Sequence, residues 1–179
     1  ARDTFKMLHE RGVYMEAKPF SIGYRVEHPQ SIIDKARFGP NAGNEILGAA
    51  DYKLVHHASN GRAVYSFCMC PGGTVVAATS EPNRVVTNGM SQYSRNERNA
   101  NAGIVVGISP QDYRQDGLHE GPVNPLDGIA FQRFWESRAY ELGEGNYMAP
   151  GQLVGDFING QRSKALRNVT PSSNPGVAS

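Results

Sequence analysis

The segment from residue 20 to residue 27 alternates apolar and other side chains without a break. Phe20, Ile22, Tyr24 and Val26 are each separated by one polar or small residue. Successive side chains of a β-strand point to opposite faces, so this alternation is typical of a strand with one buried face. The sequence therefore predicts a half-buried strand at 20–27.

Further short strands are expected where runs of strand-forming residues are separated by turn signals. They cover residues 52–57, 63–70, 74–79 and 84–87, and the continuous apolar run 103–108 predicts one more, buried strand. Asn60 followed by Gly61 favours a tight hairpin turn, and the Pro71–Gly73 run favours another. Short turns of this kind predict an antiparallel sheet or a barrel meander.

Three helices complete the predicted fold, at 2–11, 29–38 and 125–142. The buried stripe of the longest helix is expected at Leu126, Ile129, Ala130, Phe134 and Ala139, with Trp135 at its border. The fold class is therefore α+β, with a few helices flanking the sheet. Residues 1–165 form the expected domain, and residues 166–179, rich in Pro, Ser and Gly, read as a linker or disordered tail.

Composition narrows the classes of partner. The chain has 179 residues, with 18 Lys and Arg against 17 Asp and Glu, which is a net charge of +1. A charge balance this even produces no electrostatic field that would attract nucleic acid or an anionic membrane surface. Hydrophobic residues make up 39%, enough for a core. The apolar runs are far shorter than the ~18 residues that a membrane span needs.

The two cysteines, Cys68 and Cys70, are too few for a disulfide-stapled secreted domain, and we expect no signal peptide. Reduced thiols and a cytoplasmic location are therefore expected. On a regular strand the two side chains would share one face, directly before Gly72 and Gly73. Such thiols could face a redox cofactor, and the glycines would let a flat ring or a phosphate approach the backbone. Two small core residues followed by a turn explain the same pattern.

No metal site is expected. His56 and His57 lack the paired cysteine spacing of a zinc site, and adjacent side chains of a strand point opposite ways. The polar run 91–101 offers a different chemistry. Arg95 and Arg98 could contact an anion, while Asn99 and Asn101 could donate and accept hydrogen bonds. A solvated loop is the alternative.

Several separated runs resemble one family, the bacterial flavoproteins identified as FAD-dependent dehydrogenases. These runs are Ala1–Phe5, Phe67–Gly73, Thr87–Ser94, Asn99–Gly103 and Ala149–Phe157. The resemblance extends from residue 1 to about residue 165. Several motifs in the same order are more specific than any one of them.

The resemblance implies an inserted substrate or cap domain, taken from a protein whose FAD-binding half is of the Rossmann type. The Gly-rich G-x-G-x-x-G fingerprint for a dinucleotide is missing from this chain. The resemblance therefore implies FAD held mainly by the rest of the protein, an unknown small-molecule substrate, and no activity of this chain alone. It makes Cys68, Cys70, Gly72 and Gly73 the candidates for facing the flavin or the substrate. The weaker candidates are Arg95 and Asn99.

Two other readings stay open at this stage. One is a stand-alone, non-enzymatic β module that binds a small ligand, which would need several aromatic side chains exposed on one face. The other is a thiol redox protein built on Cys68 and Cys70, which would need an exposed thiol with a lowered pKa.

Overall fold

The protein is described by a computed structural model over residues 1–114, 122–166 and 168–177, and within these ranges the predicted α+β class is confirmed. The helices are α1 (Arg2–Glu10), α2 (Gln30–Phe38), α3 (Asp127–Leu142) and α4 (Val154–Ile158), with short 3-10 turns η1 (Gly39–Asn41) and η2 (Asp112–Arg114). The strands are β1 (Phe20–Pro29), β2 (Val55–His57), β3 (Ala63–Cys70), β4 (Gly73–Ala78), β5 (Val86–Ser91), β6 (Asn99–Ile108), β7 (Pro150–Gly151) and β8 (Gly176–Val177). None of the helices in the described ranges is long and apolar enough to cross a bilayer.

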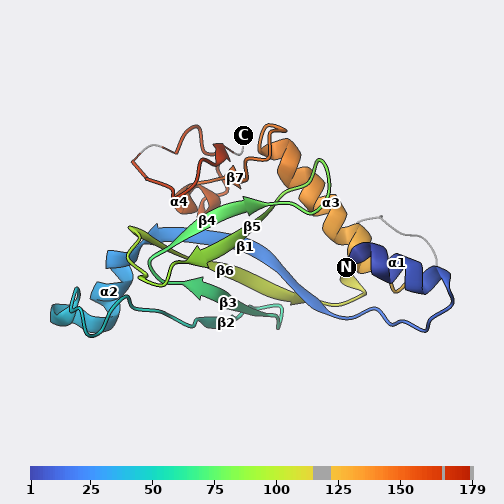
Figure 1. The fold of residues 1–179 in the computed structure, drawn as a ribbon, viewed down its shortest axis with the longest axis horizontal. Coiled ribbons are helices and arrows are strands. Elements are labelled where there is room, and N and C mark those ends of the chain that lie inside the picture. Colours follow the sequence, from blue (N-terminus) through green and yellow to red (C-terminus); the bar gives the residue numbers. More distant parts are fainter. Residues whose placement is uncertain (115–121, 167, 178–179) are drawn as a thin grey trace.

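The largest sheet has the strand order β1-β6-β3-β2, and every neighbouring pair is antiparallel (Figure 1). β1 pairs with β6 along its whole length, from Phe20 opposite Ile108 to Pro29 opposite Asn99. The predicted strand at 20–27 is therefore confirmed and continues to residue 29, but its predicted buried face is wrong at Tyr24, which is 70% exposed. β6 contains the predicted run 103–108 and lies between β1 and β3, but the run is less buried than predicted: residues 104–106 are half-buried and Gly107 is exposed, whereas residues 99–103 are buried.

The strand order departs from a simple meander. β3 pairs with β2 and β6, whereas β4 and β5 form a two-stranded hairpin of their own. The ladder of β3 is irregular between Phe67 and Cys70, and the turn that follows is buried at Gly72 with a φ of +46°. These two features lead the chain out of the sheet, so the hairpin lies over it (Figure 1). The strand predicted at 103–108 begins earlier than expected, at Asn99, so the end of the polar run 91–101 belongs to β6 and not to a loop.

Aromatic side chains close one end of the sheet. Phe20 stacks on Tyr113 with ring centroids 5.2 Å apart, and Phe131 of α3 contacts both rings. Tyr113 is almost fully buried, and its hydroxyl donates to the carbonyl oxygen of Lys18 at 2.6 Å. The predicted stripe of α3 is corrected here. The structure buries Phe131, which reaches Phe20 and Tyr113, and leaves Phe134 partly exposed.

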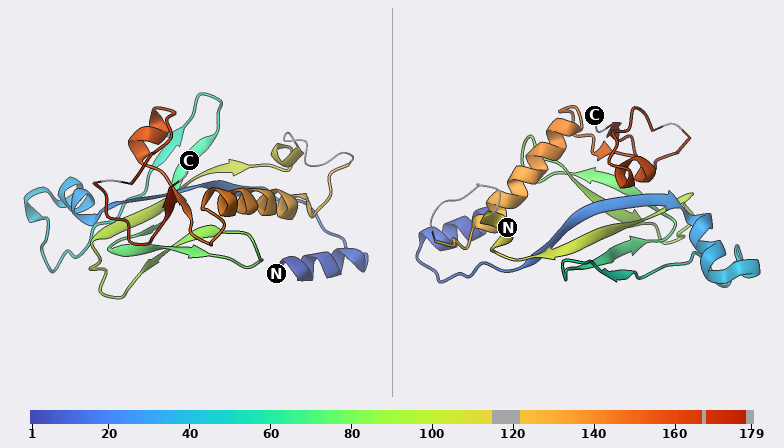
Figure 2. Two further views of the ribbon diagram at one scale, coloured as in Figure 1. Left: turned by 90° about the horizontal axis from the view of Figure 1, so that it is seen from above. Right: turned by 180° about the vertical axis from the view of Figure 1, so that it is seen from behind.

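The β4–β5 hairpin joins the two ends of the molecule. Its strands contact β6 and β3 of the large sheet, while its tip reaches α3 (Figure 1). At the tip, the amide of Val85 donates to the carbonyl oxygen of Glu136 at 3.1 Å. α1 and α2 lie at opposite ends of the molecule, as both views of Figure 2 show. The hairpin is therefore the element that spans from the sheet to the long helix.

The described part of the predicted tail, residues 168–177, runs along the rest of the fold. The Ser172 hydroxyl accepts a hydrogen bond from the Val75 amide at 2.8 Å. The carbonyl oxygen of Thr170 accepts one from the Asn99 side chain at 2.8 Å. β8 then pairs with β7 in parallel. The domain boundary at residue 165 stays a prediction.

Candidate functional site

The two cysteines do not share a face, which corrects the prediction from a regular strand. The irregularity of β3 between Phe67 and Cys70 places Cys68 at a φ of +50°. As a result, the Cys68 side chain is exposed, whereas Cys70 is 6% exposed. Both thiols are free, and the Cys70 thiol donates to the carbonyl oxygen of Cys68 at 3.4 Å. Burial raises the pKa of the Cys70 thiol, which lowers its reactivity. Because Cys68 is exposed, it is the thiol that a reagent can reach.

The predicted glycines meet the protein's own backbone. The Gly72 amide donates to the Gln30 side chain at 2.7 Å. A Cβ atom built on Gly72 would lie 1.8 Å from the carbonyl oxygen of Arg95, and one on Gly73 would lie 2.5 Å from that of Met90. Both glycines are buried. The turn can pack this closely only because these two residues have no side chain, and this explanation does not depend on any ligand at the surface.

A polar cluster that the sequence did not single out as a site lies beside the cysteines. Arg25 Nη1 donates to Asn101 Oδ1 at 2.7 Å and lies 3.5 Å from the carbonyl oxygen of Cys68. Asn101 is fully buried. Gly89 of the hairpin covers the cluster so closely that a Cβ atom there would lie 2.2 Å from Asn101 Oδ1 and 2.8 Å from the Cys70 sulfur.

Burying these polar groups has a cost. Among the described residues, Arg25 Nε and Asn101 Nδ2 are buried without a hydrogen-bond partner. A signal for part of this cluster was present in the sequence: Asn99 and Asn101 alternate with Ala100 and Ala102, which is a strand pattern rather than a loop pattern. Nothing in the sequence pointed to Arg25, because only the strand register places it diagonally from Asn101.

The two weaker candidates are in different surroundings. Arg95 has an exposed side chain and a φ of +48°, and its carbonyl group lies directly over Gly72. Asn99 is 5% exposed, and its amide donates to Glu27 and to the carbonyl oxygen of Thr170, both at 2.8 Å. The structure therefore places Arg95 at the turn formed by residues 68–73, which we call the cysteine turn. Asn99 instead holds the C-terminal segment.

Two large apolar side chains near residues 68–73 are exposed: Phe67 is 60% exposed, and Met90, whose carbonyl oxygen lies against Gly73, is 58% exposed. A small recess of about 130 Å³ opens at Arg98 and Asn99, and a larger cavity of about 580 Å³ lies between α1 and α3. Residues 68–73 line neither of these two hollows.

Residues 68–73 and the Arg25–Asn101 pair do not form an enclosure for FAD. The turn at Gly72 and Gly73 is filled by backbone from Arg95 and Met90, so it cannot cradle a pyrophosphate without moving them. The donors of Arg25 and Asn101 that lack partners are themselves buried. What this part of the chain offers is an outer face that could cover a flavin held elsewhere. In the described ranges, no group of three or more His, Cys, Asp or Glu side chains could hold a metal ion.

Comparison with known proteins defines the class of this domain. Residues 19–179 match the family described as "FAD-dependent protein, C-terminal domain-like". The chain therefore belongs to this family of FAD-dependent proteins. It is also 49% identical over 177 residues to a protein of Clostridium beijerinckii (strain ATCC 51743 / NCIMB 8052) that bears the name "Uncharacterized protein". The match covers 98% of this chain but 32% of that relative, so the chain spans about a third of the relative's length.

Proposed function

We propose that this chain is the substrate-binding or cap domain of a longer FAD-dependent oxidoreductase, a dehydrogenase whose substrate is a small molecule. The observation that carries the proposal is the family match over residues 19–179 together with a relative about three times as long as the chain. FAD is bound mainly by the remainder of that longer protein. In such a protein the flavin supplies the redox chemistry, and the domain determines the shape and the electrostatics of the pocket around the flavin.

The cysteine turn is the part of the domain that faces the flavin or the substrate. Cys68 makes the direct contact, since its side chain is exposed, as are those of Phe67 and Met90. The backbone that exposes Cys68 is fixed in position by Cys70, Gly72 and Gly73. Arg95 is a second exposed contact, whereas Asn99 acts by holding the C-terminal segment against β6.

The positions of the two ends support an insertion into the FAD-binding part. Arg2 hydrogen-bonds to Glu136 in the middle of α3, and Gly176 packs against Gly143 at the end of the same helix. The two ends of the chain therefore both lie beside α3, towards opposite ends of that helix (Figure 1). Ends on the same side of the fold are compatible with an inserted domain. The partner of this domain is therefore the FAD-binding half of the same protein, and the two free thiols support a cytoplasmic location.

The test is the visible absorbance spectrum of the full-length protein that carries this domain, purified with its native cofactor. We expect a flavin spectrum that changes in position or intensity when Cys68→Ser alters the surface next to the ring. Ser59→Ala is the matched control, because Ser59 lies by the β2–β3 turn, at the opposite end of β3 from Cys68. It should leave the spectrum unchanged.

Two results would overturn parts of the proposal. A folded full-length protein without flavin would reject the oxidoreductase and favour a stand-alone module that binds a small ligand. If neither Cys68→Ser nor Ser59→Ala changes the flavin spectrum, the protein still binds flavin, but the proposed contact between Cys68 and the flavin is rejected. In that case the exposed thiol would have to be assigned to the substrate side or to no site.

A further inference from the structure

α1 stands apart from the domain that the family match defines. The match begins at residue 19, so α1 and the segment after it precede the family domain. α1 has no buried residue. Among the described residues, the hydrogen bonds that join its side chains to the rest of the fold all come from Arg2. Arg2 is therefore the residue whose side-chain hydrogen bonds attach the helix, while the charge of Asp3 also acts on Arg133 of α3.

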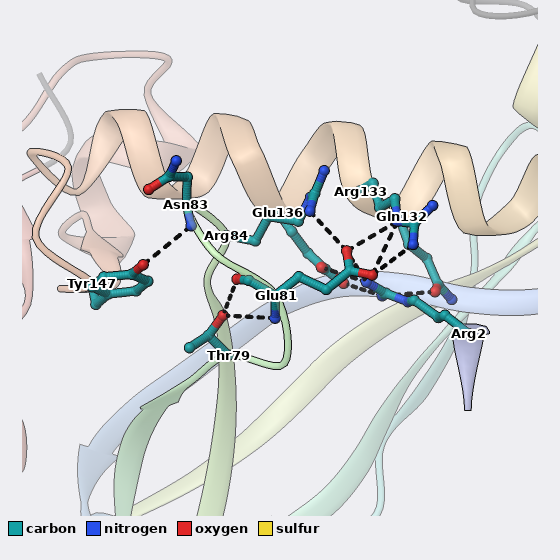
Figure 3. A network of polar contacts seen from close by, with 9 residues as sticks. All are labelled: Arg2, Thr79, Glu81, Asn83, Arg84, Gln132, Arg133, Glu136 and Tyr147. Atoms are coloured by element: carbon teal, nitrogen blue, oxygen red, sulfur yellow. Dashed lines mark hydrogen bonds and ion pairs between the residues drawn. The ribbon is translucent and has the colours of Figure 1, made fainter. Parts of the chain in front are cut away.

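Arg2 bridges two carboxylates that belong to different elements. Its Nη1 atom donates to Glu136 at 2.9 Å and to Glu81 at 3.3 Å, while Nη2 donates to Glu136 and Gln132 (Figure 3). Glu136 and Gln132 lie on α3, whereas Glu81 lies on the connection between β4 and β5. One guanidinium thus joins three parts of the chain: α1, α3 and the hairpin tip.

Glu81 is the centre of this network. Its carboxylate also accepts hydrogen bonds from Arg133 of α3, at 2.7–3.2 Å, and from Arg84, at 2.8 Å (Figure 3). The three arginines, Arg133 first, lower the pKa of Glu81 to about 2, so it stays charged at neutral pH. The side chains of Glu81, Glu136 and Arg2 are each 20% exposed or less. Ion pairs in such a part-buried setting are less screened than those in open solvent.

The hairpin held by this network is the cover of the polar cluster. Only three residues lie between buried Val85, at the tip, and Gly89, which lies on Cys70 and Asn101. The four residue steps from Val85 to Gly89 span about 13 Å, and β5 is paired with β4 from Val86 through Gly89. Lifting the tip from α3 would therefore lift Gly89 from the Cys70 thiol.

We propose that Arg2 is a latch: by bridging Glu81 and Glu136 it holds the β4–β5 hairpin on α3 and so controls access to Cys70 and the Arg25–Asn101 pair. The latch links the segment that precedes the family domain to the cluster beneath the hairpin. A change in the position of α1 would then change how often that cluster opens. This device goes beyond the proposed function and does not require flavin.

The test measures the reaction rate of the single buried thiol in the 179-residue chain. In a Cys68→Ser background, Cys70 is the one remaining cysteine, and its reaction with 5,5′-dithiobis(2-nitrobenzoate) requires local opening of the hairpin. We expect Arg2→Gln to raise the rate several-fold. Glu81→Gln should raise it by at least about tenfold, because it weakens the contacts of three arginines. Arg138→Gln removes an exposed ion pair with Glu141 on the same helix and should leave the rate unchanged.

Amide exchange followed by mass spectrometry separates local opening from general destabilisation. The latch predicts faster exchange in β5 and unchanged exchange in β6 near Ile108 for Arg2→Gln. Equal Cys70 rates in the Arg2→Gln and Arg138→Gln chains would overturn the latch. So would a uniform increase of exchange across both regions, which would make Arg2 a general stabilising contact. Because none of these measurements uses flavin, their failure would leave the proposed function standing.

Discussion

The two ends of the large sheet are held by opposite kinds of interaction. At one end Phe20, Tyr113 and Phe131 pack ring against ring. At the other end the hairpin lies on a charged guanidinium and a fully buried amide, Arg25 and Asn101. Both ends are covered, but the first gains stability from apolar burial, whereas the second leaves polar atoms without partners.

This difference is one reason for placing the proposed site at the polar end of the sheet. Polar groups that are buried at a cost persist where the surrounding fold holds them and where their chemistry is used. The polar end also contains the exposed Cys68, with a left-handed backbone that is uncommon for a residue with a side chain. Phe20, Tyr113 and Phe131, by contrast, all have a negative φ. The proposed site therefore lies at the polar end, and we expect the larger share of the folding energy at the aromatic end.

The largest effect on the unfolding free energy is expected when an aromatic ring is removed from the aromatic end. Phe131→Ala removes a ring that contacts both Phe20 and Tyr113, and such truncations cost about 3–5 kcal/mol of unfolding free energy. Urea unfolding followed by circular dichroism measures it. Phe67→Ala, at an exposed aromatic of the polar end, should cost less than about 1 kcal/mol. Similar costs for the two variants would erase the proposed contrast.

The next effect tests whether the glycine turn is structural. Gly72→Ala combines a left-handed φ with a Cβ atom 1.8 Å from a backbone oxygen, so we expect a loss of about 2–5 kcal/mol. Gly61→Ala is the matched control, because Gly61 also has a positive φ but has no atom within 4 Å of its Cβ position. It should cost about 1 kcal/mol. A Gly72→Ala chain as stable as the Gly61→Ala chain would show that the turn has room for a ligand.

A smaller effect is expected from acid. The pKa of Glu81 is lowered from an ordinary 4.5 to about 2, chiefly by the hydrogen bonds from Arg133, and Arg62 lowers that of Asp112 to about 2. Because both values are lower in the folded state, their stabilising contribution is complete above the unfolded pKa values and is lost as the pH falls towards 2. Urea midpoints between pH 6 and pH 2 should fall for the unmodified chain and fall less for Glu81→Gln. Parallel curves for the two chains would contradict the assignment of Glu81.

The smallest effect concerns the exposed cysteine. Cys68→Gly relieves the left-handed strain but adds flexibility to the unfolded chain, so the unfolding free energy should change by less than about 0.5 kcal/mol. Cys70→Gly removes a buried side chain from a strand and should cost about 2 kcal/mol. If Cys68→Gly destabilised the chain as much as Cys70→Gly, Cys68 would be a structural residue.

The strands of the aromatic end could be predicted from the sequence, but its aromatic cluster could not. Alternation from Phe20 to Val26 and the apolar run 103–108 predict two strands, which the structure contains as β1 and β6. The predicted stripe of α3 omitted Phe131, and the predicted buried face of β1 included Tyr24, which is 70% exposed. The bulge after Phe67 breaks the same rule for Cys68 and Cys70, because one irregular residue reverses the faces that follow it. The contact of Arg25 with Asn101 depends on strand register between segments 76 residues apart, which no local pattern encodes.

The most direct measurement compares the reactivity of Cys68 in this chain and in the full-length, FAD-loaded protein. Iodoacetamide labelling at neutral pH, quantified by mass spectrometry of the peptide that contains both cysteines, gives the rate at each thiol. The proposed cap role predicts that Cys68 reacts readily in the chain and at least about tenfold more slowly in the FAD-loaded protein, because the flavin-binding part covers it. Cys70 should react slowly in both. Equal rates at Cys68 in the two proteins would contradict a flavin-facing role for this end of the sheet.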